Sequence, residues 1–136
     1  MPQESLAESS AMDTWELRSR FDEGQATIEG SRDDLRLLGA CLREPLSRVL
    51  PLLVSGDPPG LWCGCLTRID VRPNARHRLL IEREGDALVI CGDLETLAEY
   101  IDFLADQAGP GHSHLEYWPG NDSLDERSVP LIIEWA

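Results

Sequence analysis

Two histidines and a glutamate near the C-terminus form the pattern in this sequence that is best suited to chemistry. His112, His114 and Glu116 occupy alternate positions, so on a β-strand their side chains would share one face, with successive residues about 6.5–7 Å apart. Two imidazoles and a carboxylate in that arrangement could hold zinc or iron. The alternative is a polar strand face that binds no metal. A small metal-binding protein or enzyme is therefore the second hypothesis for function.

Other arrangements that support catalysis are absent from the sequence. Ser113 lies between the two histidines, and on a strand it would point to the opposite face. The chain has no Gly-x-Ser-x-Gly segment of the kind that exposes a nucleophilic serine. Its glycine turns lack both the Gly-x-Gly-x-x-Gly pattern and the lysine of phosphate-binding loops. We expect a protein that is not an enzyme and that carries no cofactor.

A stripe of acidic residues lies in the second of two predicted helices. Four carboxylates share one helical face, and the helix contains no basic residue: Glu95, Glu99, Asp102 and Asp106. Like charges at these spacings destabilise a helix by about 0.2–0.5 kcal/mol per pair, so an unneutralised stripe favours a docking surface for a basic partner. Tyr117 and Trp118 could anchor that partner. The alternatives are solvated charge on the helix and burial of the aromatic side chains.

The whole chain is acidic. Asp and Glu number 25 against 12 basic residues, all of them arginine, and the formal net charge is −13. Residues 31–80 hold eight arginines and five acids, whereas residues 81–136 hold thirteen acids and two arginines. A free-standing nucleic-acid binder needs a basic patch, which excludes that class. The electrostatic field of this uneven charge would steer a basic protein partner toward the chain. The alternative is that the acidity serves only solubility.

The chain shows no membrane or export signal. No apolar run approaches the roughly 20 residues of a membrane helix, and residues 1–11 lack the basic start and apolar core of a signal peptide. We therefore expect a cytoplasmic protein that has no membrane partner. Residues 1–12 are polar and aperiodic, which predicts a disordered tail before a single domain at residues 13–136. Met12 is consequently an alternative start to Met1.

The cysteine spacing does not fit a zinc ribbon or a thioredoxin-like site. Cys63 and Cys65 are separated by one residue, and on a strand both would point to the same side as the apolar residues of that strand. We expect these two residues to be small core residues in a reducing compartment.

Alternation and turn residues define the elements that would position these groups. The predicted strands are residues 15–21, 25–29, 61–71, 77–82, 87–91, 112–118 and 129–135. Ser31 predicts the capped start of one helix, whose apolar face is formed by Leu35, Leu38 and Leu42, and Asp93 predicts the start of the other. A short helical piece is expected at residues 46–54, before a loop at residues 55–60.

A weak internal repeat has an offset of 62 residues. Residues 26–30 align with residues 88–92, and both copies read strand, glycine, helix. Gly30 and Gly92 would each permit a sharp turn by adopting dihedral angles that other residues avoid. The order of elements predicts an α+β fold with a mainly antiparallel sheet of about six or seven strands and two principal helices on one face.

The C-terminal half resembles a known family over about residues 86–135. The resemblance is to immunity protein 32 of bacterial polymorphic toxin systems, and it is carried by residues 112–121, residues 128–134 and the strand-glycine-helix segment that begins at Ile90. It implies a cytoplasmic protein that binds and neutralises a toxin, and it transfers no catalytic residues. Because many such toxins are nucleases with basic clefts, the first hypothesis is an immunity protein that binds a basic cognate toxin through its acidic surface.

Overall fold

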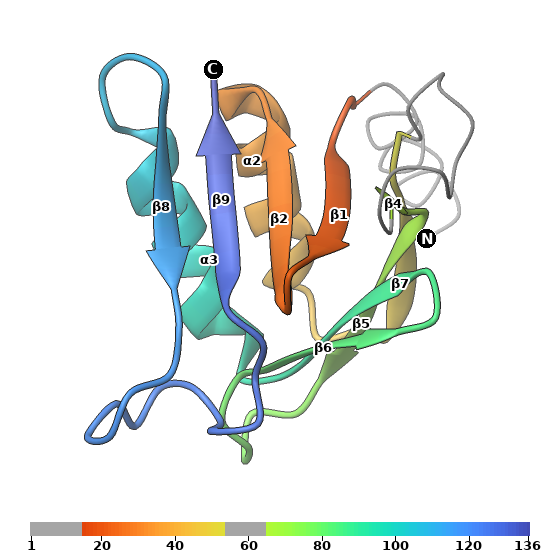
Figure 1. Cartoon of the computed structure of the whole chain (residues 1–136), viewed down its shortest axis with the longest axis vertical. Coiled ribbons are helices and arrows are strands. Elements are labelled where there is room, and N and C mark those ends of the chain that lie inside the picture. The colour runs from red at the N-terminus through yellow and green to blue at the C-terminus, as the bar shows by residue number, and fades with distance from the viewer. Residues whose placement is uncertain (1–14, 54–64) are drawn as a thin grey trace.

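Two β-sheets and two helices make up the described part of the chain, residues 15–53 and 65–136 of a computed structural model (Figure 1). The predicted tail, the two candidate starts, the predicted loop at residues 55–60 and Cys63 lie outside these residues. The helices are α2 (Arg32–Leu42) and α3 (Leu94–Ala105). The strands are β1 (Arg18–Asp22), β2 (Gln25–Gly30), β3 (Arg48–Pro51), β4 (Cys65–Leu66), β5 (Arg68–Pro73), β6 (Leu80–Glu84), β7 (Ala87–Gly92), β8 (Gly111–Leu115) and β9 (Leu131–Trp135).

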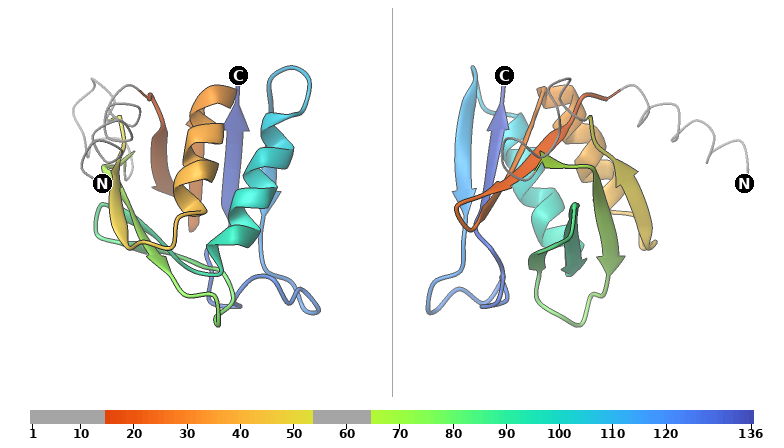
Figure 2. Two further views of the ribbon diagram at one scale, coloured as in Figure 1. Left: turned by 180° about the vertical axis from the view of Figure 1, so that it is seen from behind. Right: turned by 45° about the vertical axis from the view of Figure 1, so that its right-hand side comes forward.

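The predicted α+β class is confirmed, but the strands form two sheets rather than one. One sheet has the order β4-β1-β2-β9-β8 and the other the order β3-β5-β7-β6. A parallel pair lies inside each sheet, β2 with β9 and β5 with β7, and the other neighbours are antiparallel. Helices α2 and α3 lie side by side on one face of the five-stranded sheet (Figure 2), as the sequence predicts.

The internal repeat is also a structural duplication, and each repeat contributes strands to the sheet of the other. The hairpin β1-β2 and the hairpin β6-β7 have the same register, since Arg18 is opposite Glu29 and Leu80 is opposite Cys91. However, β2 of the first repeat pairs with β9 of the second, whereas β7 of the second repeat pairs with β5, the strand of the first repeat that corresponds to β9. Each sheet therefore contains strands from both repeats, and neither repeat can complete its sheet alone.

One cluster of buried side chains joins both sheets and both helices. It includes residues from β2, α2, β5, β7 and α3, such as Ile28, Leu38, Ile69, Ile90 and Leu97, each of which is fully buried. The apolar face predicted for the first helix is confirmed, and the Ser31 side chain accepts a hydrogen bond from the Asp34 amide at its start. Neither helix of the described residues is long and apolar enough to span a membrane.

The helical piece expected at residues 46–54 is wrong over its described part. Arg48–Pro51 is strand β3, antiparallel to β5, and Leu50 is fully buried opposite Ile69 while Val49 is exposed. Burial of one face against β5 therefore decides the conformation of this segment. The strand expected at residues 61–71 is also divided in its described part, because Thr67 leaves the ladder and donates its amide to the Asp86 carbonyl at 2.8 Å.

The two equivalent glycines differ in conformation. Gly92 has φ +92°, which confirms the predicted need for glycine, whereas Gly30 does not lie in the positive-φ region, so the same prediction for Gly30 is wrong. A Cβ atom on Gly92 would lie 2.1 Å from the Arg78 carbonyl oxygen, while one on Gly30 would meet a Leu17 methyl group at 2.6 Å. Gly92 is therefore required both by its dihedral angle and by close contact with backbone.

Replacement of Gly92 by alanine is expected to lower the free energy of unfolding by about 2–4 kcal/mol, because the strain of positive φ is added to the clash with the Arg78 backbone. Urea unfolding measures this loss. Gly85→Ala is the matched control, since Gly85 has φ +61° but open space around the added Cβ, and it should cost about 1 kcal/mol. Equal losses in the two variants would contradict a role for the backbone contact.

Candidate functional site

The acidic stripe of α3 lies beside the arginines of α2. The end of α2 lies near the start of α3, so the two helices run antiparallel. Arg43 Nη1 lies 2.5 Å from Asp102 Oδ2 and Arg43 Nε lies 3.4 Å from Glu95 Oε1. Arg36 Nη2 lies 3.3 Å from an oxygen of Asp106, which is the C-cap residue of α3. Three of the four acids are thus ion-paired within the protein, so the stripe is not unneutralised as the sequence suggested.

These ion pairs link the two helices at the surface. The hydrogen bond from the Arg43 guanidinium to Asp102 is the main reason that the pKa of Arg43 is raised above its usual value. The side chains remain more than a third exposed, so solvent weakens the attraction. Asp102 also lies against Gly39 of α2, where an added Cβ would meet its Oδ1 at 2.9 Å. The carboxylates of this stripe consequently serve helix packing as well as surface charge.

Glu99 differs from the other three acids, because it makes no ion pair among the described residues. One turn further along α3 is Phe103, whose side chain is 64 % exposed. Phe103 is not among the site residues predicted from the sequence. The signal was available, since Phe103 is apolar yet falls outside the stripe formed by Leu97, Ile101 and Leu104. Glu99 and Phe103 together place a free carboxylate beside an exposed aromatic ring, which is a common composition for a binding surface.

The two aromatic residues predicted as anchors have different environments. Tyr117 is half-buried and packs against the hydrophobic core. Trp118, in contrast, is 57 % exposed. Trp118 is therefore the member of the pair with a ring available for contact.

The two histidines lie on the strand face that the sequence predicted. His112 and His114 are both exposed on β8, with ring centroids 5.5 Å apart, and Glu116 follows the end of the strand. Ser113 points the other way and shares a hydrogen bond with the Tyr100 hydroxyl. Within residues 15–53 and 65–136, no group of three or more His, Cys, Asp or Glu side chains is placed to hold a metal ion. The metal alternative therefore has no site in the described structure.

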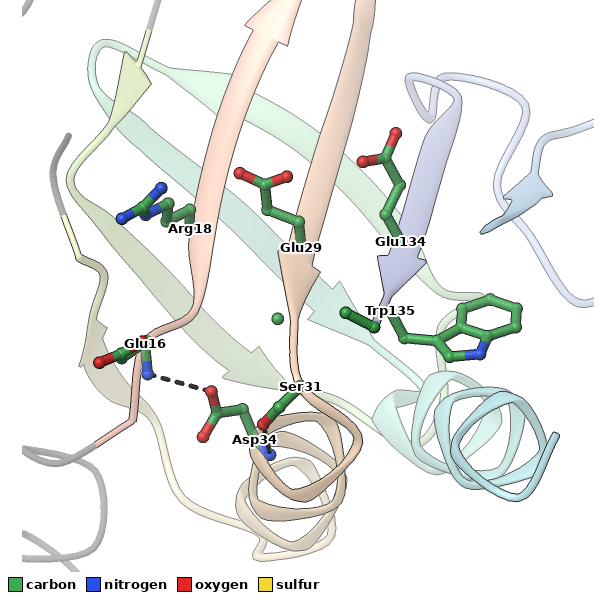
Figure 3. Close-up of a pocket in the computed structure, with 9 residues that line it drawn as sticks. Glu16, Arg18, Glu29, Ser31, Asp34, Glu134 and Trp135 are labelled. Atoms are coloured by element: carbon green, nitrogen blue, oxygen red, sulfur yellow. Dashed lines mark hydrogen bonds between the residues drawn. The ribbon is translucent and has the colours of Figure 1, made fainter. Parts of the chain in front are cut away.

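An acidic cavity of about 570 Å³ lies at the ends of β2 and β9, where α2 begins (Figure 3). Glu29 and Glu134 are register neighbours in the parallel pair, and Figure 3 shows both projecting to the same side. Asp34 accepts a hydrogen bond from the Glu16 amide at 3.1 Å. The cavity is lined by the four carboxylates of Glu16, Glu29, Asp34 and Glu134 and by the guanidinium of Arg18, and none of the four carboxylates is ion-paired among the described residues. This cavity was not predicted from the sequence, because its residues come from three separate segments.

Replacement of Arg43 by glutamine is expected to lower the free energy of unfolding by about 0.5–1.5 kcal/mol, since it removes two partly exposed ion pairs between helices. Urea unfolding at low and high salt checks this, and the loss should shrink at high salt. Arg20→Gln is the control, because Arg20 makes no ion pair among the described residues, and it should change stability by less than about 0.5 kcal/mol. If both variants lose the same stability, the pairs do not stabilise the helices.

Comparison with protein families gives one match. Residues 87–136 match the family described as immunity protein 32. The matched segment begins with β7 and includes α3, β8 and β9, so it is part of the chain and leaves the whole first repeat and β6 outside. The resemblance predicted from the sequence is confirmed over this segment. Curated proteins and solved structures gave no match.

Proposed function

We propose that this protein is an immunity protein that binds a cognate toxin in the cytoplasm and blocks it by direct contact. The observation that carries the proposal is the match of residues 87–136 to the immunity protein 32 family. The absence of an assembled metal triad among the described residues gives the competing metalloprotein hypothesis no support. Inhibition requires no chemistry from the protein itself, only a surface that fits the toxin and covers its working site.

The contact surface in this proposal is the outer side of α3, together with Trp118. It comprises the acidic residues Glu95, Glu99, Asp102 and Asp106 and the exposed Phe103. Three observations support this choice. The surface lies within the matched segment, no strand lies in front of the helix pair in the left view of Figure 2, and Phe103 supplies an apolar centre with acidic neighbours. Glu99 is the acid most available to a partner, because the other three are paired with α2.

Charge supports a basic toxin as the partner. The chain has a formal net charge of −13. This negative charge raises the rate of encounter with a basic partner, and it repels other acidic proteins. A nuclease with a basic cleft is a toxin class that fits this charge. Long-range attraction between the two surfaces would be screened by salt, since the Debye length falls to about 8 Å at physiological ionic strength.

The first experiment tests the function itself. The full-length protein, tagged and expressed in its own host, is used to capture partners, and mass spectrometry identifies them. We expect one protein with a toxin domain, recovered near one-to-one. Co-expression of the two proteins in a second bacterium should then restore growth that the toxin alone prevents. Failure to restore growth, with both proteins expressed and folded, would overturn the proposal.

Glu99→Gln and Phe103→Ala test the contact surface on α3. Glu99→Gln is expected to slow association about two- to fivefold at low salt and much less at high salt, because it removes one steering charge. Phe103→Ala should instead raise the dissociation rate, with a tenfold or larger increase in Kd if the ring is a central anchor. Surface plasmon resonance with the captured toxin measures both rates.

Two control variants separate this surface from general acidity and from the acidic cavity. Glu23→Gln removes one carboxylate from the exposed β1–β2 turn and should leave both rates within about twofold. Glu29→Gln with Glu134→Gln removes two of the four carboxylates that line the acidic cavity. If that double variant weakens binding while the α3 variants do not, the toxin contacts the cavity and the α3 assignment is wrong.

A further inference from the structure

A second cavity, of about 670 Å³, has the opposite charge from the first. It lies where β5 and β7 end and where the loop before β6 meets the loop before β9. Four arginines and one histidine line it, with one carboxylate: Arg72, Arg76, Arg78, Arg127, His77 and Asp125. Four of the 12 basic residues of a strongly acidic chain thus surround a single cavity. General solubility does not account for this concentration, because the net charge is already far from zero.

The internal repeat relates the two cavities. With the offset of 62 residues, Glu16 and Glu134 of the acidic cavity correspond to Arg78 and Arg72 of the basic cavity, and Glu29 corresponds to Cys91. The acidic cavity lies at the start of α2, and the basic cavity includes Gly92, directly before α3. Since the helices are antiparallel, the cavities lie at opposite ends of the helix pair. The duplicated backbone therefore presents four carboxylates and one arginine at one end, and four arginines and one carboxylate at the other.

Some of the cationic groups in the basic cavity have acidic partners, and others do not. Arg127 is held by two contacts of 3.1 Å to Asp125, and this pairing lowers the pKa of Asp125 and raises that of Arg127. Arg78 lies 3.6 Å from Asp122, and Arg72 pairs with Asp70 and Glu84. Arg76 and His77 make no ion pair among the described residues. The cavity thus retains an unpaired guanidinium beside partly neutralised ones.

Backbone hydrogen bonds fix the two loops that carry these side chains. Asn74 donates its amide to the Gly92 carbonyl at 2.8 Å, and its side chain accepts the Arg76 amide at 3.1 Å. Across the cavity, Asp125 donates its amide to the Leu79 carbonyl at 2.8 Å. The loops are therefore anchored to the sheet on both sides, so the arginine backbones are preorganised while their side chains can adjust to a ligand.

We propose that this cavity binds a small molecule through a phosphate or carboxylate group, with Arg76 and Arg127 as its principal contacts and Arg72, Arg78 and His77 contributing charge. Guanidinium groups suit this ligand class because their planar donors match two oxygens of a phosphate or carboxylate at once. The volume is within the range of small-ligand sites. Asp125 opposes the binding of an anion, and a ligand would share Arg127 with it. This site is separate from the α3 surface and does not depend on the toxin.

Isothermal titration of the full-length protein with inorganic phosphate, and separately with citrate, tests the proposal at constant ionic strength. We expect saturable binding of at least one of the two anions, and the tighter one shows whether phosphate or carboxylate is preferred. Arg76→Gln should weaken that binding at least threefold. Arg76→Gln combined with Arg127→Gln should weaken it at least tenfold. Because Arg76 makes no ion pair among the described residues, the single variant should keep the fold, which circular dichroism verifies.

The matched control is Arg20→Gln with Arg83→Gln, which removes two positive charges from residues that do not line the cavity. It should change the affinity less than twofold. Equal weakening by the control and cavity variants would show that the anions respond only to net charge, and the proposal would be wrong. The absence of saturable binding of both anions to the unchanged protein would also overturn it.

Discussion

The rest of the structure depends on the parallel pairing of strands from the two different repeats. In each sheet a parallel pair joins the hairpin of one repeat to a strand of the other, β2 with β9 and β7 with β5. Parallel neighbours cannot be joined by a tight turn. Between β2 and β9 the chain therefore leaves one sheet and enters the other before it returns. The two helices lie side by side in the segments that make this connection. Because of this exchange each sheet contains strands of both repeats. Unfolding of one sheet would therefore remove pairing partners from strands of both repeats, so the two repeats form one cooperative unit.

The antiparallel helix pair follows from that exchange, and it determines how much of the acidic charge is available to a partner. Arg43 and Arg36 of α2 neutralise most of the stripe on α3. These ion pairs link α3, which lies inside the matched segment, to α2, which lies outside it. The first repeat therefore supports the α3 surface that is proposed to bind the toxin. The outer side of α3 thus combines partly neutralised acids with an unpaired carboxylate at Glu99 and apolar area at Phe103, which is more specific than an acidic face alone.

The duplication also explains how a strongly acidic protein can carry mainly negative charge at one end of its helix pair and mainly positive charge at the other. The same strand-glycine-helix framework occurs at both ends of the helix pair, but carboxylates line the cavity at one end and arginines the cavity at the other. After duplication, each copy could change its charges without a change in the backbone, because these side chains lie at the rim rather than in the core. The proposed toxin surface and the proposed anion site can therefore coexist in one small fold.

Local interactions allowed much of the architecture to be predicted from the sequence. The Ser31 cap, the leucine face of α2, the β6–β7 hairpin and the strand that carries His112 and His114 depend on residues close in sequence, and each was predicted. The sequence also determined the acidity and the repeat. The tertiary structure alone decided which strands pair, that residues 48–51 form a strand, that Arg43 neutralises Asp102, and that two cavities of opposite charge exist. These features join residues far apart in the chain, and neither periodicity nor spacing carries information about which distant residues meet.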